Sequence, residues 1–291
     1  MKNASVKNGF GVGILIFAAA AIIALPVRTL QFFTILESGT GFYSKTDWSV
    51  WVLYAVIAAA IVSIVAFGMT KRKKLDYSLA VQKRPGMGVA SFLAAAGVLL
   101  DSANSIIAVM NINETADEMS KPAATLLCGQ AIFAVLSAIY FLALGISYIG
   151  GKTNGSEYRL VSLAPVLWSI FRIVYRFTRT ISYTRVSDLM LEMLMLAFMI
   201  MFFMAFAQVN SRVNSENCEW KIAAYGLPAA LLALICFVPR LIVTLSGHSE
   251  LLYSQSSAEF CDLGTALFII STVTARVADR VSAIPDKTDE E

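Results

Sequence analysis

Residues 160–210 read LVSLAPVLWSIFRIVYRFTRTISYTRVSDLMLEMLMLAFMIMFFMAFAQVN, which is two apolar segments joined by a short polar turn. Each segment is long enough to cross a bilayer as a helix. The first carries Arg172, Arg176 and Arg179, and the second carries Glu192. Charged side chains within a membrane are costly, so they face a protein interior or a water-filled cavity. The stretch therefore predicts a helical hairpin with a polar interior.

The composition of the whole chain indicates an integral membrane protein. The 291 residues are 57% hydrophobic and only 15% charged, with a mean hydropathy of +0.69. A soluble domain carries about a quarter charged residues. The net charge of +3 implies no nucleic-acid partner, because basic loops orient membrane proteins in any case. The partner that the composition predicts is the lipid bilayer.

Eight apolar stretches predict an all-α, polytopic bundle of about eight transmembrane helices, arranged as four hairpins. We expect the spans at residues 10–33, 48–69, 88–110, 123–149, 160–183, 186–208, 220–245 and 258–277. Residues 1–284 would form a single transmembrane domain, followed by a short acidic tail at 285–291. The first stretch continues through Pro26 and Arg28 without a small-residue cleavage site, so we interpret it as a retained helix and not as a signal peptide.

Lysine and arginine are distributed unequally between the alternate loops. The link after the second span holds Lys71, Arg72, Lys73, Lys74, Lys83 and Arg84. The loops on the other side hold only Lys45, Lys121 and Arg185. Basic residues stay on the cytoplasmic side of a membrane. Both termini are therefore predicted to be cytoplasmic, and the predicted location is the cytoplasmic membrane of a bacterium.

The segment at 160–183 has a polar face and an apolar face when it is drawn as a helix. At about 100° per residue, Arg172, Arg176 and Arg179 fall within a wedge of about 60°, which Trp168 and Tyr175 border. The opposite side carries Leu167, Ile170, Ile173, Val174, Phe177 and Ile181. This separation predicts that one face meets lipid or an apolar neighbour and the other a polar interior.

Depth in the membrane suggests partners for two of these arginines. Asp101 and Arg172 lie at similar depths in two spans that run in the same direction, so they form one candidate ion pair. The short turn of the hairpin sets Arg179 opposite Glu192 as a second pair. Arg176 has no carboxylate at a matching depth, which makes it the first choice for a contact with a ligand, because a guanidinium fork suits carboxylates and phosphates.

A second polar group is expected near the outer ends of other spans. It consists of Arg28, Arg240, Glu259 and Asp262, with Asp47 nearby. We expect these residues to form a third, outer polar cluster, and we expect spans three, six and eight to supply the carboxylates of the pocket.

The sequence gives no positive sign of an enzyme, a metal site or a cofactor. The four cysteines are dispersed without a CxxC pair, and His248 is the single histidine. One histidine cannot by itself make a zinc site. No Walker loop, GxSxG or HExxH occurs, so no catalytic residue is predicted.

Two functions fit these features. The first is a binding or transport protein for a small anionic or zwitterionic solute or a lipid headgroup. Its pocket would be lined by Arg172, Arg176, Arg179, Asp101, Glu192, Trp168 and Tyr175. The alternative is a structural or assembly protein of the membrane, whose charges form a salt-bridge network that locks the helices and whose partners are other membrane proteins.

The predicted topology can be tested with reporter fusions. A fusion after Lys74 and a fusion at Glu291 should both report a cytoplasmic location, because translocating a cluster of lysine and arginine is disfavoured. A signal from the outer side at either point would contradict the arrangement of eight spans.

Overall fold

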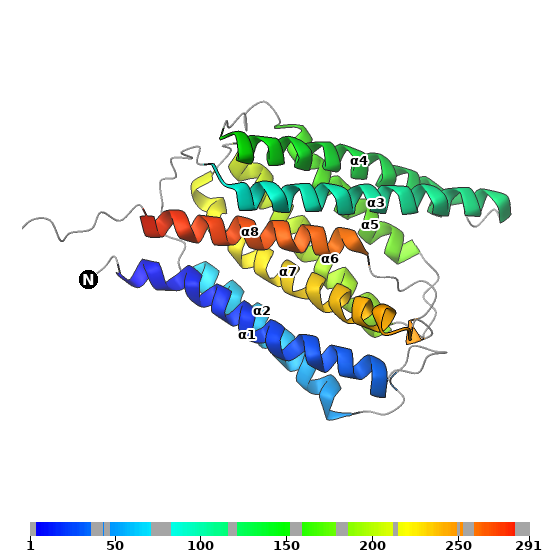
Figure 1. Ribbon diagram of the computed structural model, residues 1–291, viewed down its shortest axis with the longest axis horizontal. Coiled ribbons are helices and arrows are strands. Elements are labelled where there is room, and N and C mark those ends of the chain that lie inside the picture. The colour runs from blue at the N-terminus through cyan, green and yellow to red at the C-terminus, as the bar shows by residue number, and fades with distance from the viewer. Residues whose placement is uncertain are drawn as a thin grey trace, which may run out of the picture.

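The computed structural model is helical throughout the part of the chain that it describes. It describes residues 4–35, 43, 47–70, 83–115, 121–151, 159–178, 186–211, 215–248, 251–252 and 259–282. Its elements are α1 (Ala4–Thr34), α2 (Trp48–Thr70), α3 (Pro85–Thr115), α4 (Lys121–Gly150), the short 3-10 helix η2 (Val161–Leu163), α5 (Ala164–Thr178), α6 (Val186–Asn210), α7 (Ser215–Leu245) and α8 (Phe260–Ser282). The predicted all-α class is confirmed (Figure 1).

Six helices in the described residues are long and apolar enough to cross a membrane. Their spans are Gly11–Thr34, Trp48–Thr70, Pro85–Asn111, Pro122–Gly150, Asp188–Asn210 and Trp220–Leu245. The chain is thus a helical protein of the multi-pass membrane type. The other two helices are not long and apolar enough over their described residues: α5 has 15 residues, about 22 Å against a hydrocarbon core of about 30 Å, and the apolar part of α8 is Phe260–Ala275. A count of eight spans stays a prediction.

Helix α5 has the two faces that the sequence predicts. Trp168, Ser169 and Arg172 are buried on one side. The other side exposes Leu167, Ile170, Val174 and Phe177. The η2 turn precedes the helix. The arginines of α5 therefore point into the bundle.

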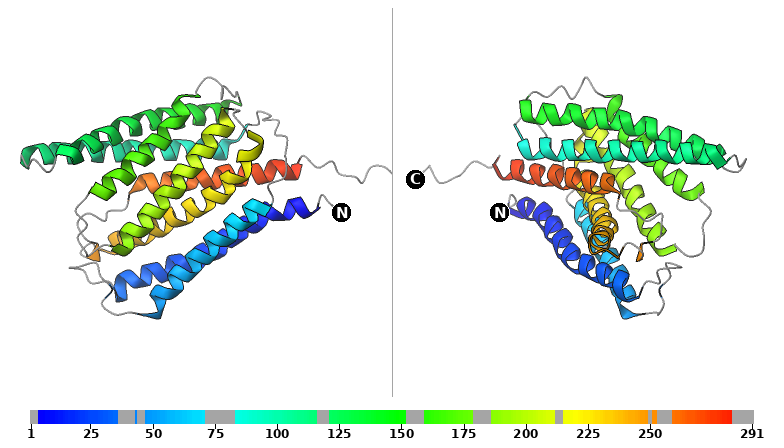
Figure 2. Two further views of the ribbon diagram at one scale, coloured as in Figure 1. Left: turned by 180° about the vertical axis from the view of Figure 1, so that it is seen from behind. Right: turned by 45° about the vertical axis from the view of Figure 1, so that its right-hand side comes forward.

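Helix α7 lies at the centre of the bundle. It packs against α1, α2, α6 and α8, and it is the most buried of the six long apolar helices. A run of small and aliphatic side chains, Ala229, Ala230, Leu231, Leu232 and Ala233, is fully buried along it. Helices α1 and α2 pair with each other and reach the rest of the bundle mainly through α7 (Figure 2).

An aromatic core joins α4, α6 and α8. The ring centroid of Phe268 lies 5.0 Å from that of Phe141 and 5.3 Å from that of Phe206. Edge-to-face aromatic pairs of this kind stabilise a fold by about 0.5–1.5 kcal/mol beyond the burial of their area. Met195 and Met199 of α6 are buried in the same core, where methionine fills space between rings.

Helices α3 and α8 approach each other so closely that two glycines are required. A Cβ on Gly97 of α3 would lie 2.6 Å from the carbonyl oxygen of Phe260 and 2.9 Å from Cα of Cys261. A Cβ on Gly264 of α8 would lie 2.7 Å from the carbonyl oxygen of Leu93. Small residues allow this contact between backbones in a membrane. It places Asp101, one turn after Gly97, beside the start of α8.

The close approach of α3 and α8 at Gly97 leads to a prediction about the stability of the protein. Gly97→Ala should lower the stability of the detergent-purified protein by about 1–3 kcal/mol, because the added methyl meets backbone atoms that cannot rotate away. Thermal unfolding measures the loss. Gly86→Ala is the matched control in the same helix, since nothing lies within 4 Å of its added Cβ. If both variants melt alike, the close α3–α8 contact is wrong.

Candidate functional site: a chain of alternating charges

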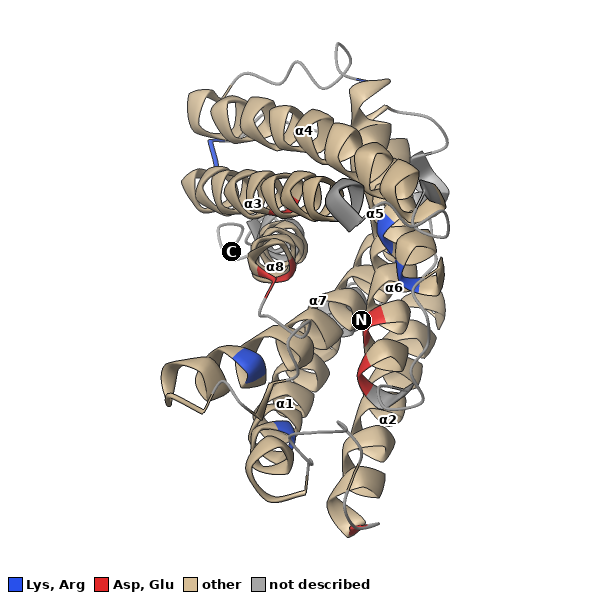
Figure 3. Cartoon of the chain, turned by 90° about the vertical axis from the view of Figure 1, so that its right-hand side faces the viewer, with Lys and Arg blue, Asp and Glu red and all other residues tan. Residues whose placement is uncertain are grey.

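Charged residues lie on the helices at the end of the bundle where α1, α5 and α7 end and where α6 and α8 begin; Figure 3 colours their positions on the chain. The acidic residues lie near helix starts and the basic residues near helix ends: Asp188, Glu192, Glu259 and Asp262 on one side, and Arg28, Arg172, Arg176 and Arg240 on the other. Carboxylates at helix N-termini and guanidinium groups at C-termini complement the helix dipoles, an effect confined to the outermost turns.

The first half of the cluster joins α1, α6 and α7. Arg28 Nη2 forms an ion pair with Asp188 Oδ1. The other oxygen of Asp188 lies 3.7 Å from Arg240 Nη2, and the same nitrogen lies 2.6 Å from Glu192 Oε1. Asp188 and Glu192 are one helical turn apart on α6, so the two carboxylates hold Arg240 between them.

The second half joins α6, α5 and α8. Glu192 Oε2 lies 2.8 Å from Arg176 Nη1, and Arg176 Nη2 lies 2.5 Å from Glu259 Oε1. The other oxygen of Glu259 pairs with Arg172 Nη2. Arg172 Nη1 lies 3.0 Å from Asp262 Oδ1. From Arg28 to Asp262 the described charges alternate in sign without a break, and we name these eight residues the charge chain.

The outer polar cluster and the arginine face are therefore one structure and not two. Arg28, Arg240, Glu259 and Asp262 lie in the same chain of ion pairs as Arg172, Arg176 and Glu192. Five helices contribute to it, because the antiparallel arrangement brings helix ends from distant parts of the sequence to one end of the bundle.

Arg28 has neutral partners as well as its carboxylate. Its Nη1 donates to Gln31 Oε1 at 2.9 Å and to Tyr43 Oη at 2.8 Å. Its guanidinium carbon lies 5.0 Å from the centre of the Phe32 ring. These contacts fix the side chain, which is only 2% exposed.

The expected pair between Asp101 and Arg172 is not formed. Arg172 pairs with Glu259 and Asp262 instead. Asp101 Oδ2 accepts hydrogen bonds from Trp168 Nε1 at 2.8 Å and from Gln130 Nε2 at 3.0 Å. Similar depth made the pair plausible, but the α3–α8 contact brings the acidic start of α8 nearer to Arg172.

One further expectation about the arginines changes, and a second falls outside the described residues. Arg176, for which the sequence offered no carboxylate, is held by Glu192 and Glu259. Arg179, the expected partner of Glu192, lies outside the described residues, and Glu192 pairs with Arg176 and Arg240. Tyr175 is half-buried beside this region. As ligand contacts, all of these residues remain a prediction.

Sequence reasoning missed Asp188 and Gln130. Asp188 stands four residues before Glu192, a spacing that puts two carboxylates on one helix face. That spacing in the sequence indicates that Asp188 belongs to the same polar face as Glu192. Gln130 had no comparable signal, because a single amide within an apolar helix carries no charge pattern.

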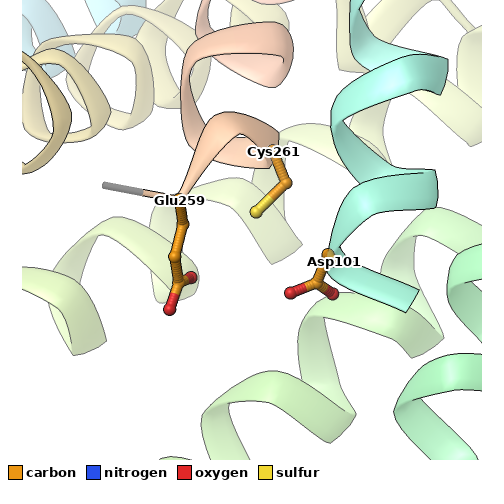
Figure 4. Close-up of side chains that lie close together, drawn as sticks. All are labelled: Asp101, Glu259 and Cys261. Atoms are coloured by element: carbon orange, nitrogen blue, oxygen red, sulfur yellow. The ribbon is translucent and has the colours of Figure 1, made fainter. Parts of the chain in front are cut away.

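One further group of side chains adjoins the chain at Asp101. The ligand atoms of Asp101, Glu259 and Cys261 lie within 4.8 Å of one another (Figure 4). Cys261 Sγ also lies 3.7 Å from Asp262 Oδ1. These side chains come from α3 and from the start of α8, which the glycine contact holds together.

The charge chain can stabilise helix positions, but it holds no set of groups for covalent catalysis. Each described guanidinium in it is balanced by carboxylates, and no histidine or serine nucleophile takes part. Removing one partner from a buried ion pair costs about 3–5 kcal/mol, because the remaining charge is left uncompensated.

Comparisons with known proteins supply no function for this arrangement. No protein-family model, curated protein or solved structure matches the chain. Its function must therefore be inferred from the geometry of its own residues.

Glu192 provides a test of the charge chain, since it bridges Arg176 and Arg240. Glu192→Gln should lower the free energy of unfolding by about 3–5 kcal/mol, because two buried cations lose a shared counter-charge. Thermal unfolding in detergent measures the loss. Asp47→Asn is the control: Asp47 is half-buried and its Oδ1 accepts from the backbone N–H of Trp48, a bond that asparagine can keep. Equal, small effects of both changes would contradict the network.

Proposed function

We propose that the chain is a structural or assembly protein of a membrane, in which the charge chain locks the outer ends of the helices. The observation that supports this most is the pairing of the arginines. Arg172, Arg176 and Arg240 each contact two carboxylates, some of which they share. Every guanidinium of the charge chain already has a carboxylate partner.

An anionic ligand at these arginines would have to displace a carboxylate that is already in place. The displaced carboxylate would then need a new counter-charge in a partly buried region. The net gain is only the difference between two similar ion pairs, so the described arrangement disfavours an anion pocket.

The charge chain joins helices that otherwise have limited contact. Helix α1 reaches α6 through the pair between Arg28 and Asp188, although α1 packs mainly on α2 and α7. Arg172 and Arg176 join α5 to α8 and α6, although α5 packs mainly on α4 and α6. The expected partners are other membrane proteins, and the proposed location is a bacterial cytoplasmic membrane with residues 71–74 inside.

A second candidate is binding or transport of a small anionic or zwitterionic solute or a lipid headgroup. One observation favours it: the side chains of Asp188 and Glu259 are 20% and 22% exposed, and that of Arg176 is 13% exposed. The edge of the charge chain can therefore be reached from outside the bundle. A zwitterion could exchange with an ion pair there without changing the net charge.

Ligand-dependent melting of purified protein separates the two functions. The structural proposal expects no shift of the melting temperature with phosphate, small carboxylates, amino acids or anionic lipid headgroups. It also expects Arg176→Lys to melt lower without any ligand, because lysine keeps the charge but cannot reach two carboxylates with a planar fork.

The binding function gives the opposite result. A saturable rise in melting temperature with one of these compounds, lost in Arg176→Lys while that variant still folds, would overturn the structural proposal. Asp47→Asn again serves as the control, because it changes one charge outside the charge chain.

A further inference from the structure

In the part of the chain that the structure describes, exposed phenylalanine and tryptophan side chains lie only near helix ends. The middle of the same helices exposes aliphatic side chains instead, such as Ile22 of α1 and Val62 of α2. The exposed rings lie at the end of α1, at both ends of α2, at the end of α5 and at the start of α8: Phe33, Trp48, Trp51, Phe67, Phe177 and Phe260. Aromatic rings at helix ends with aliphatic side chains between them are typical of membrane helices.

Most of these rings lie at the end of the bundle that holds the charge chain, where α1 and α5 end and α2 and α8 begin (Figure 1). Trp48 and Trp51 are the most exposed of them, at 71% and 70%. They stand three residues apart in the first turn of α2, so they lie on one face of the helix. The other two tryptophans are buried, since Trp168 is 0% exposed and Trp220 9%.

The two exposed indoles suit the layer between the hydrocarbon core of a bilayer and its headgroups. An indole combines a large apolar ring with one N–H donor, so it is favoured where one side is apolar and the other is wet. Helix α2 has 23 residues, which is about 34 Å against a hydrocarbon core of about 30 Å. The first turn of a spanning α2 therefore falls at the edge of the core.

A lipid layer explains this pattern better than a partner protein does. The exposed rings are spread over four helices of the described bundle, whereas a protein that docked on one side would cover rings gathered on that side. Asp47 directly precedes the two tryptophans, and its Oδ1 accepts from the backbone N–H of Trp48. The sequence thus changes from charged to aromatic to aliphatic within the first turns of α2, as the surroundings of a chain that enters a bilayer do.

We propose that Trp48 and Trp51 lie in the interfacial layer of the bilayer, among the glycerol and headgroup atoms of phospholipids, and that this contact sets the depth of the charge chain. Arg28 lies six residues before the last residue of α1, and Arg240 five residues before that of α7. These separations are about 7–9 Å along the helices. The charge chain then lies just inside the edge of the hydrocarbon core. This inference does not depend on whether the charge chain is structural or binds a solute.

Quenching of tryptophan fluorescence by brominated lipids tests the proposal on the full chain in phosphatidylcholine vesicles. Bromine near the carbonyl end of the acyl chains should quench Trp48 and Trp51 at least about twice as strongly as bromine near the methyl end, because tryptophans of an aromatic belt lie at the headgroup level. Their signal is the difference between the wild type and the double variant Trp48→Phe, Trp51→Phe, which keeps Trp168 and Trp220. The double variant should melt like the wild type, since both rings are exposed.

Val62→Trp, made in the double variant, is the matched control for depth. Val62 is 67% exposed near the middle of α2, so a ring there should respond more to bromine near the methyl end. The proposal is overturned if the signal of Trp48 and Trp51 follows this deep pattern. It is equally overturned if a water-soluble quencher acts on that signal and neither brominated lipid does, which would place the start of α2 in water. Protection from every quencher would overturn it too, because protein would then cover both rings.

Discussion

An arginine side chain cannot lose its charge under ordinary conditions, and the end of the bundle that holds the charge chain is arranged around that constraint. Each buried guanidinium needs a carboxylate within reach, because a lone ion in a low-dielectric region is costly. The antiparallel helices provide the match: α1, α5 and α7 bring arginines to the end where α6 and α8 bring aspartate and glutamate. Asp188, Glu192 and Glu259 each pair with two arginines, and in this way eight residues join five helices.

The charge chain in turn depends on packing deeper in the bundle. Gly97 and Gly264 let α3 and α8 meet at their backbones, which sets the start of α8 between Arg172 and Asp101. The aromatic core around Phe268 lies two turns further along α8 and excludes water on that side. Ion pairs strengthen where the surrounding dielectric is low. Packing and charge thus stabilise the same arrangement of α5, α6 and α8.

The sequence was sufficient for the helical class, for the two faces of α5 and for most members of the charge chain. Helical spacing decides these features, because it places Arg172 and Arg176 on one side and Leu167 and Ile170 on the other. The pairing was not predictable in the same way. Depth along a helix says which residues lie at the same level but not which helices are neighbours, so Asp101 was assigned to Arg172 although Glu259 and Asp262 lie closer.

Asp101 is held differently from the carboxylates of the charge chain. Along the charge chain, an incoming ion of either sign must displace a partner that is already present, so it gains only the difference between two ion pairs. The carboxylate of Asp101 accepts hydrogen bonds from the neutral donors Trp168 and Gln130. Trp168 connects the two regions, since its ring also lies 5.0 Å from the guanidinium carbon of Arg172. The hydrogen bond to Asp101 therefore fixes the same indole that positions the last arginine of the charge chain.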